Sequence, residues 1–83
     1  MSELHNLMNI GSYIEEKLYA AGIYDEKTLR ELGSKEAFLK IRTMDDTVCI
    51  RVLYALEGAL QGIKDSQLSA YDKADLKAFF KSL

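Results

Sequence analysis

The sequence predicts an all-α fold, a compact bundle of about five short helices within 83 residues. Three observations support this prediction. Apolar residues recur at i, i+3, i+4 and i+7 in several segments, which is the spacing of one helix face. No segment shows the sustained alternation of apolar and polar residues that is typical of a strand. The chain has no proline, so glycine is the main residue available to end a helix.

The composition is typical of one globular domain. Hydrophobic residues make up 48% and charged residues 29% of the sequence, which is enough apolar surface for one modest core. We expect a single domain over residues 1–83, with residues 1–6 as a flexible N-terminus. The net charge of −2 argues against a strong, non-specific nucleic-acid binder, because such proteins usually carry a basic excess.

The single cysteine, Cys49, excludes an intramolecular disulfide and favours a reduced, intracellular protein. The N-terminus lacks the basic and apolar regions of a signal peptide. The longest apolar run, VLYAL, is far too short to span a membrane. We therefore expect a cytoplasmic location and no membrane partner.

The first helix is predicted over residues 13–21. Ser12 and Glu15 match a capping box at its start. Gly22 fits the position after a helix end, where the backbone needs a positive φ. Ahead of this helix, a short turn is expected to pack on the core through Leu4, Leu7, Met8 and Ile10.

Two short helices are predicted next, over residues 26–32 and 35–42, with Gly33 between them. Asp25 is the expected N-cap of the former and Ser34 that of the latter. The segments IGSYIEEKL and LGSKEAFLK are similar, so the sequence predicts two similar Gly–Ser corners.

The fourth helix, VCIRVLYALEGALQGI over residues 48–63, is the longest and most apolar. The loop TMDDT precedes it, and Thr47 is its expected N-cap. Gly58 inside a helix costs about 1 kcal/mol relative to alanine, so we expect a compensating contact. A stripe of small residues would let another helix approach, in the core or at a dimer seam: Ala55, Gly58, Ala59 and Gly62.

The last helix is predicted to follow a loop around KDSQ, with Ser66 or Ser69 as its N-cap. Its apolar residues keep the i, i+3, i+4, i+7 spacing and are expected to close the core. They are Leu76, Phe79, Phe80 and Leu83.

Most of the chain, from about Leu7 to Phe80, resembles the C-terminal domain of the TfoX/Sxy competence regulators. The resemblance is carried by LMNIGSYIEEKLYAAGI, LRELGSKEAFLKI and LYALEGALQGI, which occur in the order and spacing of that family. It implies a small helical domain related to helix–hairpin–helix folds. In the family this domain often follows an N-terminal domain, and the full protein regulates genes for DNA uptake. We expect this chain to be a stand-alone C-terminal domain.

The two glycine corners are candidate phosphate sites, because the free N–H groups of a helix N-terminus bind anions. The first corner is Gly11 with Ser12. Two glutamates follow it and would repel phosphate, so a structural corner is the simpler interpretation. The second corner is Gly33 with Ser34. The basic residues that could form a face around it are Lys35, Lys40, Arg42 and Arg51.

No combination of residues predicts an enzyme, a cofactor or a metal. The only histidine, His5, and the only cysteine, Cys49, do not make a zinc site or a credible catalytic pair. Cys49 is predicted to be a small buried hydrophobe. Arg51 is expected to form a structural ion pair with Asp45, Asp46 or Glu57.

The leading hypothesis is therefore a non-catalytic interaction module that acts by protein–protein contact, with a partner that the sequence does not identify. The resemblance implies that its role is regulatory. Tyr13 and Tyr24 are candidate anchors, because tyrosine suits half-buried interfaces. Gly58 and Gly62 are candidate residues of a dimer seam, which leaves both a monomer and a homodimer open. Weak nucleic-acid binding through the glycine corners and their basic neighbours is the alternative.

Overall fold

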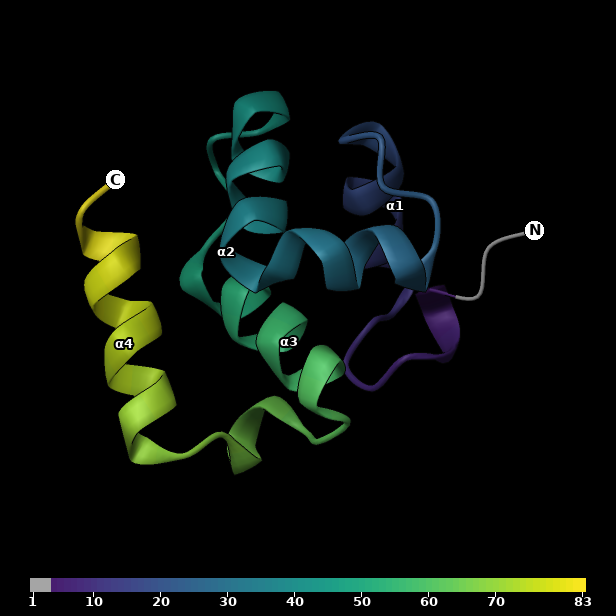
Figure 1. Cartoon of the computed structure of the whole chain (residues 1–83). Coiled ribbons are helices and arrows are strands. Elements are labelled where there is room, and N and C mark those ends of the chain that lie inside the picture. Colours follow the sequence, from purple (N-terminus) through teal and green to yellow (C-terminus); the bar gives the residue numbers. More distant parts are fainter. Residues whose placement is uncertain (1–3) are drawn as a thin grey trace.

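The computed structural model describes residues 4–83, which form four α-helices and two 3-10 helices (Figure 1). The elements in order are η1 (Leu4–Asn6), α1 (Ser12–Ala20), α2 (Glu26–Met44), α3 (Ile50–Gln61), η2 (Asp65–Gln67) and α4 (Ala70–Lys81). No strand occurs among these residues, so the all-α prediction is confirmed. About five helices were predicted and four α-helices are present, because the predicted second and third helices are the two segments of α2; the predicted break between them at Gly33 is confirmed.

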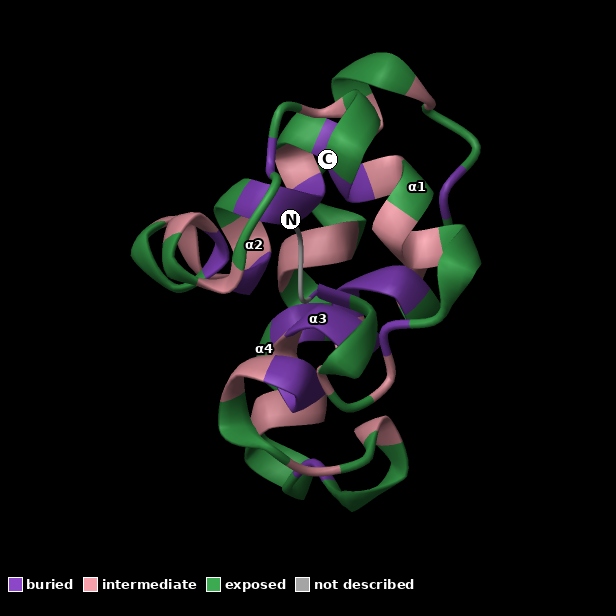
Figure 2. Cartoon of the chain, turned by 90° about the vertical axis from the view of Figure 1, so that its right-hand side faces the viewer, coloured by how far each residue is buried: buried purple, intermediate pink, exposed green. Residues whose placement is uncertain are grey.

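The centre of the domain is the pair α2 and α3, which contact each other most extensively. The helix α1 packs on α2 and α4 packs on α3, and in Figure 1 they lie on opposite sides of the central pair. Figure 2 shows the buried residues concentrated on α3, whereas α1 and α4 are mostly exposed or intermediate. The Cα radius of gyration of 11.6 Å is that of a compact domain of this length.

The core draws on every α-helix and on the N-terminal segment. Leu4, within the segment 1–6 that was predicted to be flexible, is fully buried at the start of η1, whereas His5 and Asn6 are exposed; residues 1–3 lie outside the described part. Met8 was expected in the core and is 43% exposed. The largest side chains that are fully buried are Phe38, Leu4, Leu18, Ile23, Leu29, Ile41, Leu53 and Leu56.

The capping box at the start of α1 is not formed. Gly11 is the N-cap, Ser12 is already helical, and no side chain caps this end. The Glu15 carboxylate instead accepts the backbone N–H of His5 at 3.0 Å and lies 3.1 Å from its Nδ1. The carboxylate is therefore used to hold η1 against α1. Gly22 follows the end of α1 with a positive φ, as predicted.

The helix α2 is broken at Gly33, where φ is 81° and ψ is 168°. This backbone region is essentially restricted to glycine, so the position marks a kink between two helical segments. Asp25 caps the first segment as predicted, because its carboxylate accepts the N–H of Thr28 at 2.8 Å. Ser34 does not act as the predicted cap: its side chain is buried and donates to Glu57.

The helix α3 begins later than predicted, with Cys49 as its N-cap. Thr47 is not the cap, because its N–H and hydroxyl both bond to Asp45. Cys49 is exposed, so the prediction of a buried cysteine is wrong. Val48 before it is buried and Ile50 after it is half-buried, so the exposure is confined to the N-cap position itself.

The glycine inside α3 is explained by the approach of the chain's own N-terminal loop. A Cβ on Gly58 would lie 2.5 Å from Asn9 Nδ2 and 2.8 Å from the carbonyl oxygen of Ile63. Asn9 donates to that carbonyl at 2.9 Å and accepts the N–H of Asp65 at 3.2 Å. The compensating contact is thus a polar clamp between the loop before α1 and the end of α3.

The helix α4 begins at the predicted cap, Ser69, whose hydroxyl accepts the N–H of Asp72 at 3.0 Å. Leu76 is buried, and Phe80 lies against Phe38 with 5.9 Å between ring centroids. Leu83 was expected to close the core and is 43% exposed, because α4 ends at Lys81.

Candidate functional site

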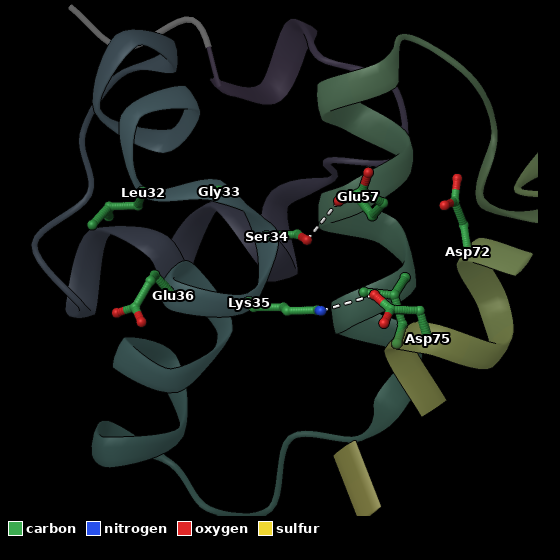
Figure 3. Close-up of a pocket in the computed structure, with 9 residues that line it drawn as sticks. Leu32, Gly33, Ser34, Lys35, Glu36, Glu57, Asp72 and Asp75 are labelled. Carbon is green, nitrogen blue, oxygen red and sulfur yellow. Dashed lines mark hydrogen bonds and ion pairs between the residues drawn. The ribbon is translucent and has the colours of Figure 1, made fainter. Parts of the chain in front are cut away.

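The Gly33 corner opens into a cleft of about 350 Å³ between α2, α3 and α4 (Figure 3). One basic side chain, Lys35, lines it. The acidic side chains that line it are Glu36, Glu57, Asp72 and Asp75. An excess of carboxylates makes the local potential negative, which disfavours the binding of phosphate at this corner.

The polar groups of this cleft largely satisfy one another. Ser34 Oγ donates to Glu57 Oε1 at 2.6 Å, and Gln61 Nε2 donates both to Glu57 Oε2 and to Asp72 Oδ2. Lys35 Nζ lies 2.8 Å from Asp75 Oδ2, and a dashed line marks this ion pair in Figure 3. These contacts join α2, α3 and α4, so the corner links three helices.

The predicted basic face around Gly33 is not assembled in one place. Lys35 alone lines the cleft. Lys40 is exposed further along α2, and the Arg42 guanidinium lies 6.0 Å from the centre of the Phe80 ring. Arg51 belongs to another cleft. It takes part in none of the ion pairs found among residues 4–83, so its predicted pairing with a carboxylate is wrong.

A second cleft, of about 340 Å³, is lined by Tyr13 and Ile14 in the first turn of α1, just after the Gly11 corner, and by the start of α3. Gly11 and Cys49, the N-caps of the two helices, provide no side-chain hydrogen bond. Arg51 is the basic residue of this cleft and Asp65 its acidic one. That Arg51 shares a cleft with the first turn of α1 could not be seen in the sequence, because almost forty positions separate them.

The exposed tyrosines of α1 and of the loop after it form a second candidate surface. Tyr13 and Tyr24, the two predicted anchors, are 56% and 61% exposed. They do not contact each other. Tyr24 instead pairs with Tyr19, with 6.0 Å between ring centroids and 49° between ring planes, while Tyr13 lies next to Lys17 Nζ. Tyr19 is therefore the residue that sequence reasoning missed, and we call Tyr19 and Tyr24 the tyrosine pair.

Gly58 and Gly62, the predicted seam residues, have roles within the chain. Gly58 is buried beneath Asn9, and Gly62 ends α3 in a left-handed conformation. Ala55 and Ala59 of the same stripe are also buried. The whole stripe is thus occupied by the domain's own packing or by the end of its helix.

An ion pair fixes α1 to the loop between α2 and α3. Lys17 Nζ lies 2.6 Å from Asp45 Oδ2, and each side chain is about a quarter exposed. The hydrogen bond from Lys17, followed by the two bonds from Thr47, holds the pKa of Asp45 well below its usual range. The same hydrogen bond raises the pKa of Lys17 above its ordinary value. This pair positions the helix that carries Tyr13 and Tyr19.

Two classes of site find no support in the part of the chain that the structure describes. Within residues 4–83, no three His, Cys, Asp or Glu side chains are grouped so that they could hold a metal ion. Over the same residues, no helix is both long and apolar enough to cross a membrane.

The fold and its corners define a small all-α domain with surface clefts of modest size. The TfoX C-terminal domain family matches residues 1–80, so the chain belongs to this family and is a competence-regulator-like domain. Protein Sxy of Escherichia coli (strain K12) is 34% identical over 80 residues. The match covers 96% of this chain but only 38% of Sxy, so the chain spans well under half of that relative.

Two solved structures have the same fold. An uncharacterized protein from Listeria monocytogenes, in a triclinic crystal form, is 48% identical and superposes with a TM-score of 0.93. The match covers 95% of this chain and 90% of that one. A protein of unknown function from the same organism, in a tetragonal form, gives the same identity and TM-score and covers 95% and 98% of the two chains.

Proposed function

We propose that this domain is a non-catalytic, cytoplasmic interaction module of competence-regulator type, which binds a protein partner through the tyrosine pair and Tyr13. The observation that carries the proposal is the contact between Tyr19 and Tyr24, two large side chains that are 37% and 61% exposed. Tyrosine is enriched among the residues that dominate binding energy at protein interfaces. The family membership supports the regulatory part of the proposal.

The helix that carries two of the three tyrosines is held to the rest of the domain. The Lys17–Asp45 ion pair and the buried Leu18 anchor α1, on which Tyr13 and Tyr19 lie. The aromatic bodies supply apolar contact area, and the hydroxyl groups can stay in contact with water at the rim.

Site-specific photo-crosslinking in cells tests this proposal. A photoreactive amino acid replaces Tyr24 in one strain and Tyr71 in another, since Tyr71 is 78% exposed on α4 and serves as the matched control. We expect a discrete crosslinked protein from position 24 and not from position 71. Identical crosslinks from both positions, or none from position 24, would contradict the proposal.

The identified protein is then purified and its affinity measured. Tyr19→Ala with Tyr24→Ala should raise its Kd at least tenfold, because each ring is a candidate hot spot. Tyr71→Ala should leave the Kd unchanged. If the partner is a second copy of this chain, sedimentation velocity will show a dimer that the double variant dissociates.

Weak nucleic-acid binding at the Gly11 corner is the second candidate function. The favouring observation is that Arg51 shares a cleft with Cys49, the N-cap of α3, and with Tyr13 and Ile14 in the first turn of α1, and that neither helix start has a side-chain cap. Free N–H groups at helix N-termini and a nearby guanidinium favour phosphate. The sequence resemblance implies a relationship to helix–hairpin–helix folds, and that expectation supports this second candidate. It predicts that Arg51→Gln weakens DNA binding measured by fluorescence anisotropy.

A further inference from the structure

The helix α4 carries its acidic and basic side chains on different sides. Asp72 accepts a hydrogen bond from Gln61, and Asp75 pairs with Lys35, so both carboxylates face the cleft between α2 and α3. The other three charged residues of α4 follow one another at intervals of four positions. They are Lys73, Lys77 and Lys81, which we call the lysine row.

The lysine row occupies one side of the helix. Positions four apart differ by about 40° around an α-helix and by about 6 Å along its axis. The three side chains therefore lie within an arc of about 80° over about 12 Å. Lys77 and Lys81 are exposed, and Lys73 Nζ lies 3.4 Å from the carbonyl oxygen of Ser66. None of the three takes part in an ion pair with another described residue.

The stability of the helix does not account for this arrangement. Like charges at i, i+4 repel one another, and the row contains two such pairs. The helix dipole favours a cation in the last turn, which explains Lys81. It disfavours one near the first turn, where Lys73 lies. Since two of these effects destabilise the helix, binding is a candidate reason for the arrangement of the three lysines.

We propose that the lysine row binds the phosphate backbone of a nucleic-acid duplex. Its positive charges complement a polyanion, and the small residues beside the row, Ala70 and Ala74, allow a close approach. The row contains no aromatic residue, whereas single strands are typically held by stacking on aromatic rings. It also lacks the large apolar anchor on which protein interfaces usually depend. Charge complementarity without an anchor favours the duplex backbone.

This inference is independent of the tyrosine pair, which lies on α1 and the loop that follows it. It also differs from the second candidate function, because Arg51 belongs to the cleft beside Gly11. The three surfaces can therefore be separated by substitution. Binding of this kind is sequence-independent and is expected to be weak, since the chain as a whole carries a net charge of −2.

Fluorescence anisotropy of a labelled DNA duplex, titrated with the protein between 50 and 200 mM salt, tests the inference. Neutralising three phosphates gives a slope of log K against log salt of about −2.7, which is about a 40-fold loss of affinity over this range. Lys77→Gln with Lys81→Gln leaves one contact and should reduce the loss to about 3.5-fold. The double variant should also bind more weakly than the wild-type protein at 50 mM salt.

Matched variants separate a binding role from a folding defect. Lys27→Gln removes one exposed lysine of α2 and should leave the slope unchanged, whereas Lys77→Gln should reduce it by about 0.9. Lys77→Glu replaces two repulsive i, i+4 pairs with attractive ones, so it should abolish binding while the Tm stays equal or rises.

Several outcomes would overturn the inference. A wild-type slope shallower than −1, or an equal effect of Lys27→Gln, would show that the row is not a specific contact. Loss of binding in Arg51→Gln with full binding in the Lys77/Lys81 double variant would move the site to the Gly11 cleft. Binding of polyglutamate in place of the duplex would identify an acidic protein segment as the occupant.

Discussion

Gly11 and Gly33 each precede a serine at the start of a helical segment, and the two serines lie in opposite environments. Ser12 is exposed and has no side-chain partner at the helix end, whereas Ser34 is buried and bonded to Glu57 of α3. The glycines differ as well. Gly11 has a φ of −92°, which any residue can adopt, while Gly33 has a φ of 81°. Similar local sequence thus supports a surface corner in one place and a junction of three helices in the other.

The largest expected difference between the corners comes from replacing their glycines by alanine. Gly33→Ala places a Cβ on a backbone with φ 81° and ψ 168°, so we expect a loss of about 2 kcal/mol in the free energy of unfolding. Gly11→Ala meets no atom within 4 Å and keeps an ordinary φ, so its loss should stay below about 1 kcal/mol. Urea denaturation measures both, and equal losses would contradict the comparison.

The serines should show a smaller difference in the same direction. Ser34→Ala removes the donor to Glu57 Oε1 in a buried position, and we expect a loss of about 1 to 2 kcal/mol. Ser12→Ala should change stability by less than about 0.5 kcal/mol, because the residue is exposed. A Ser34→Ala protein as stable as the wild-type protein would show that the Glu57 contact does not hold the junction.

The pH dependence of stability sharpens the comparison, because an ion pair between Lys17 and Asp45 holds α1 to the loop after α2. The pKa of Asp45 is lowered in the folded state, so its contribution is present above the ordinary value of 3.8 and is lost as the pH falls below it. The pKa of Lys17 is raised, so its contribution is present below 10.5 and is lost as the pH rises through the raised value.

The difference in unfolding free energy between the wild-type protein and Asp45→Asn should therefore be greatest between about pH 4 and pH 10. It should shrink below that window and should fall when salt is added, because the pair is partly exposed. The difference between the wild-type protein and Ser34→Ala should respond much less to salt. Equal salt dependence for the two variants would show that the Ser34–Glu57 hydrogen bond is screened as strongly as the Lys17–Asp45 ion pair.

The smallest predicted effect is an increase in the free energy of unfolding. Gly11→Asp supplies a side-chain acceptor at a helix end that lacks one, and its charge suits the N-terminal dipole. We expect thermal unfolding to show an increase of about 0.5 kcal/mol, reduced by repulsion from the nearby glutamates. A loss of stability would show that the N–H groups of this corner are already satisfied.

Features that depend on neighbours in the chain could be predicted from the sequence. Asp25 and Ser69 cap their helices because each accepts an N–H group three residues ahead. Gly22 follows a helix end for an equally local reason. The family resemblance was recognisable in the same way, since it depends on the order and spacing of short segments.

Features that depend on distant partners could not be predicted. Glu15 bonds to His5 instead of completing the capping box, and Ser34 bonds to Glu57 of α3 instead of capping its own helical segment. Arg51 shares a cleft with Tyr13 and Ile14 of α1 only in the folded chain. Tyr19 was missed as a candidate anchor because its pairing with Tyr24 depends on the turn between them. In each case a tertiary contact outweighs a local preference.

The clamp at Asn9 has a consequence for synthesis on the ribosome. The partners of Asn9, at Ile63 and Asp65, are translated more than fifty residues after it. The segment η1 can contact α1 as soon as both are made, because His5 bonds to Glu15. The loop at Asn9 reaches its final contacts only after α3 and the residues that follow it have been made. The first residue of the clamp to be translated is therefore among the last to reach its folded contacts.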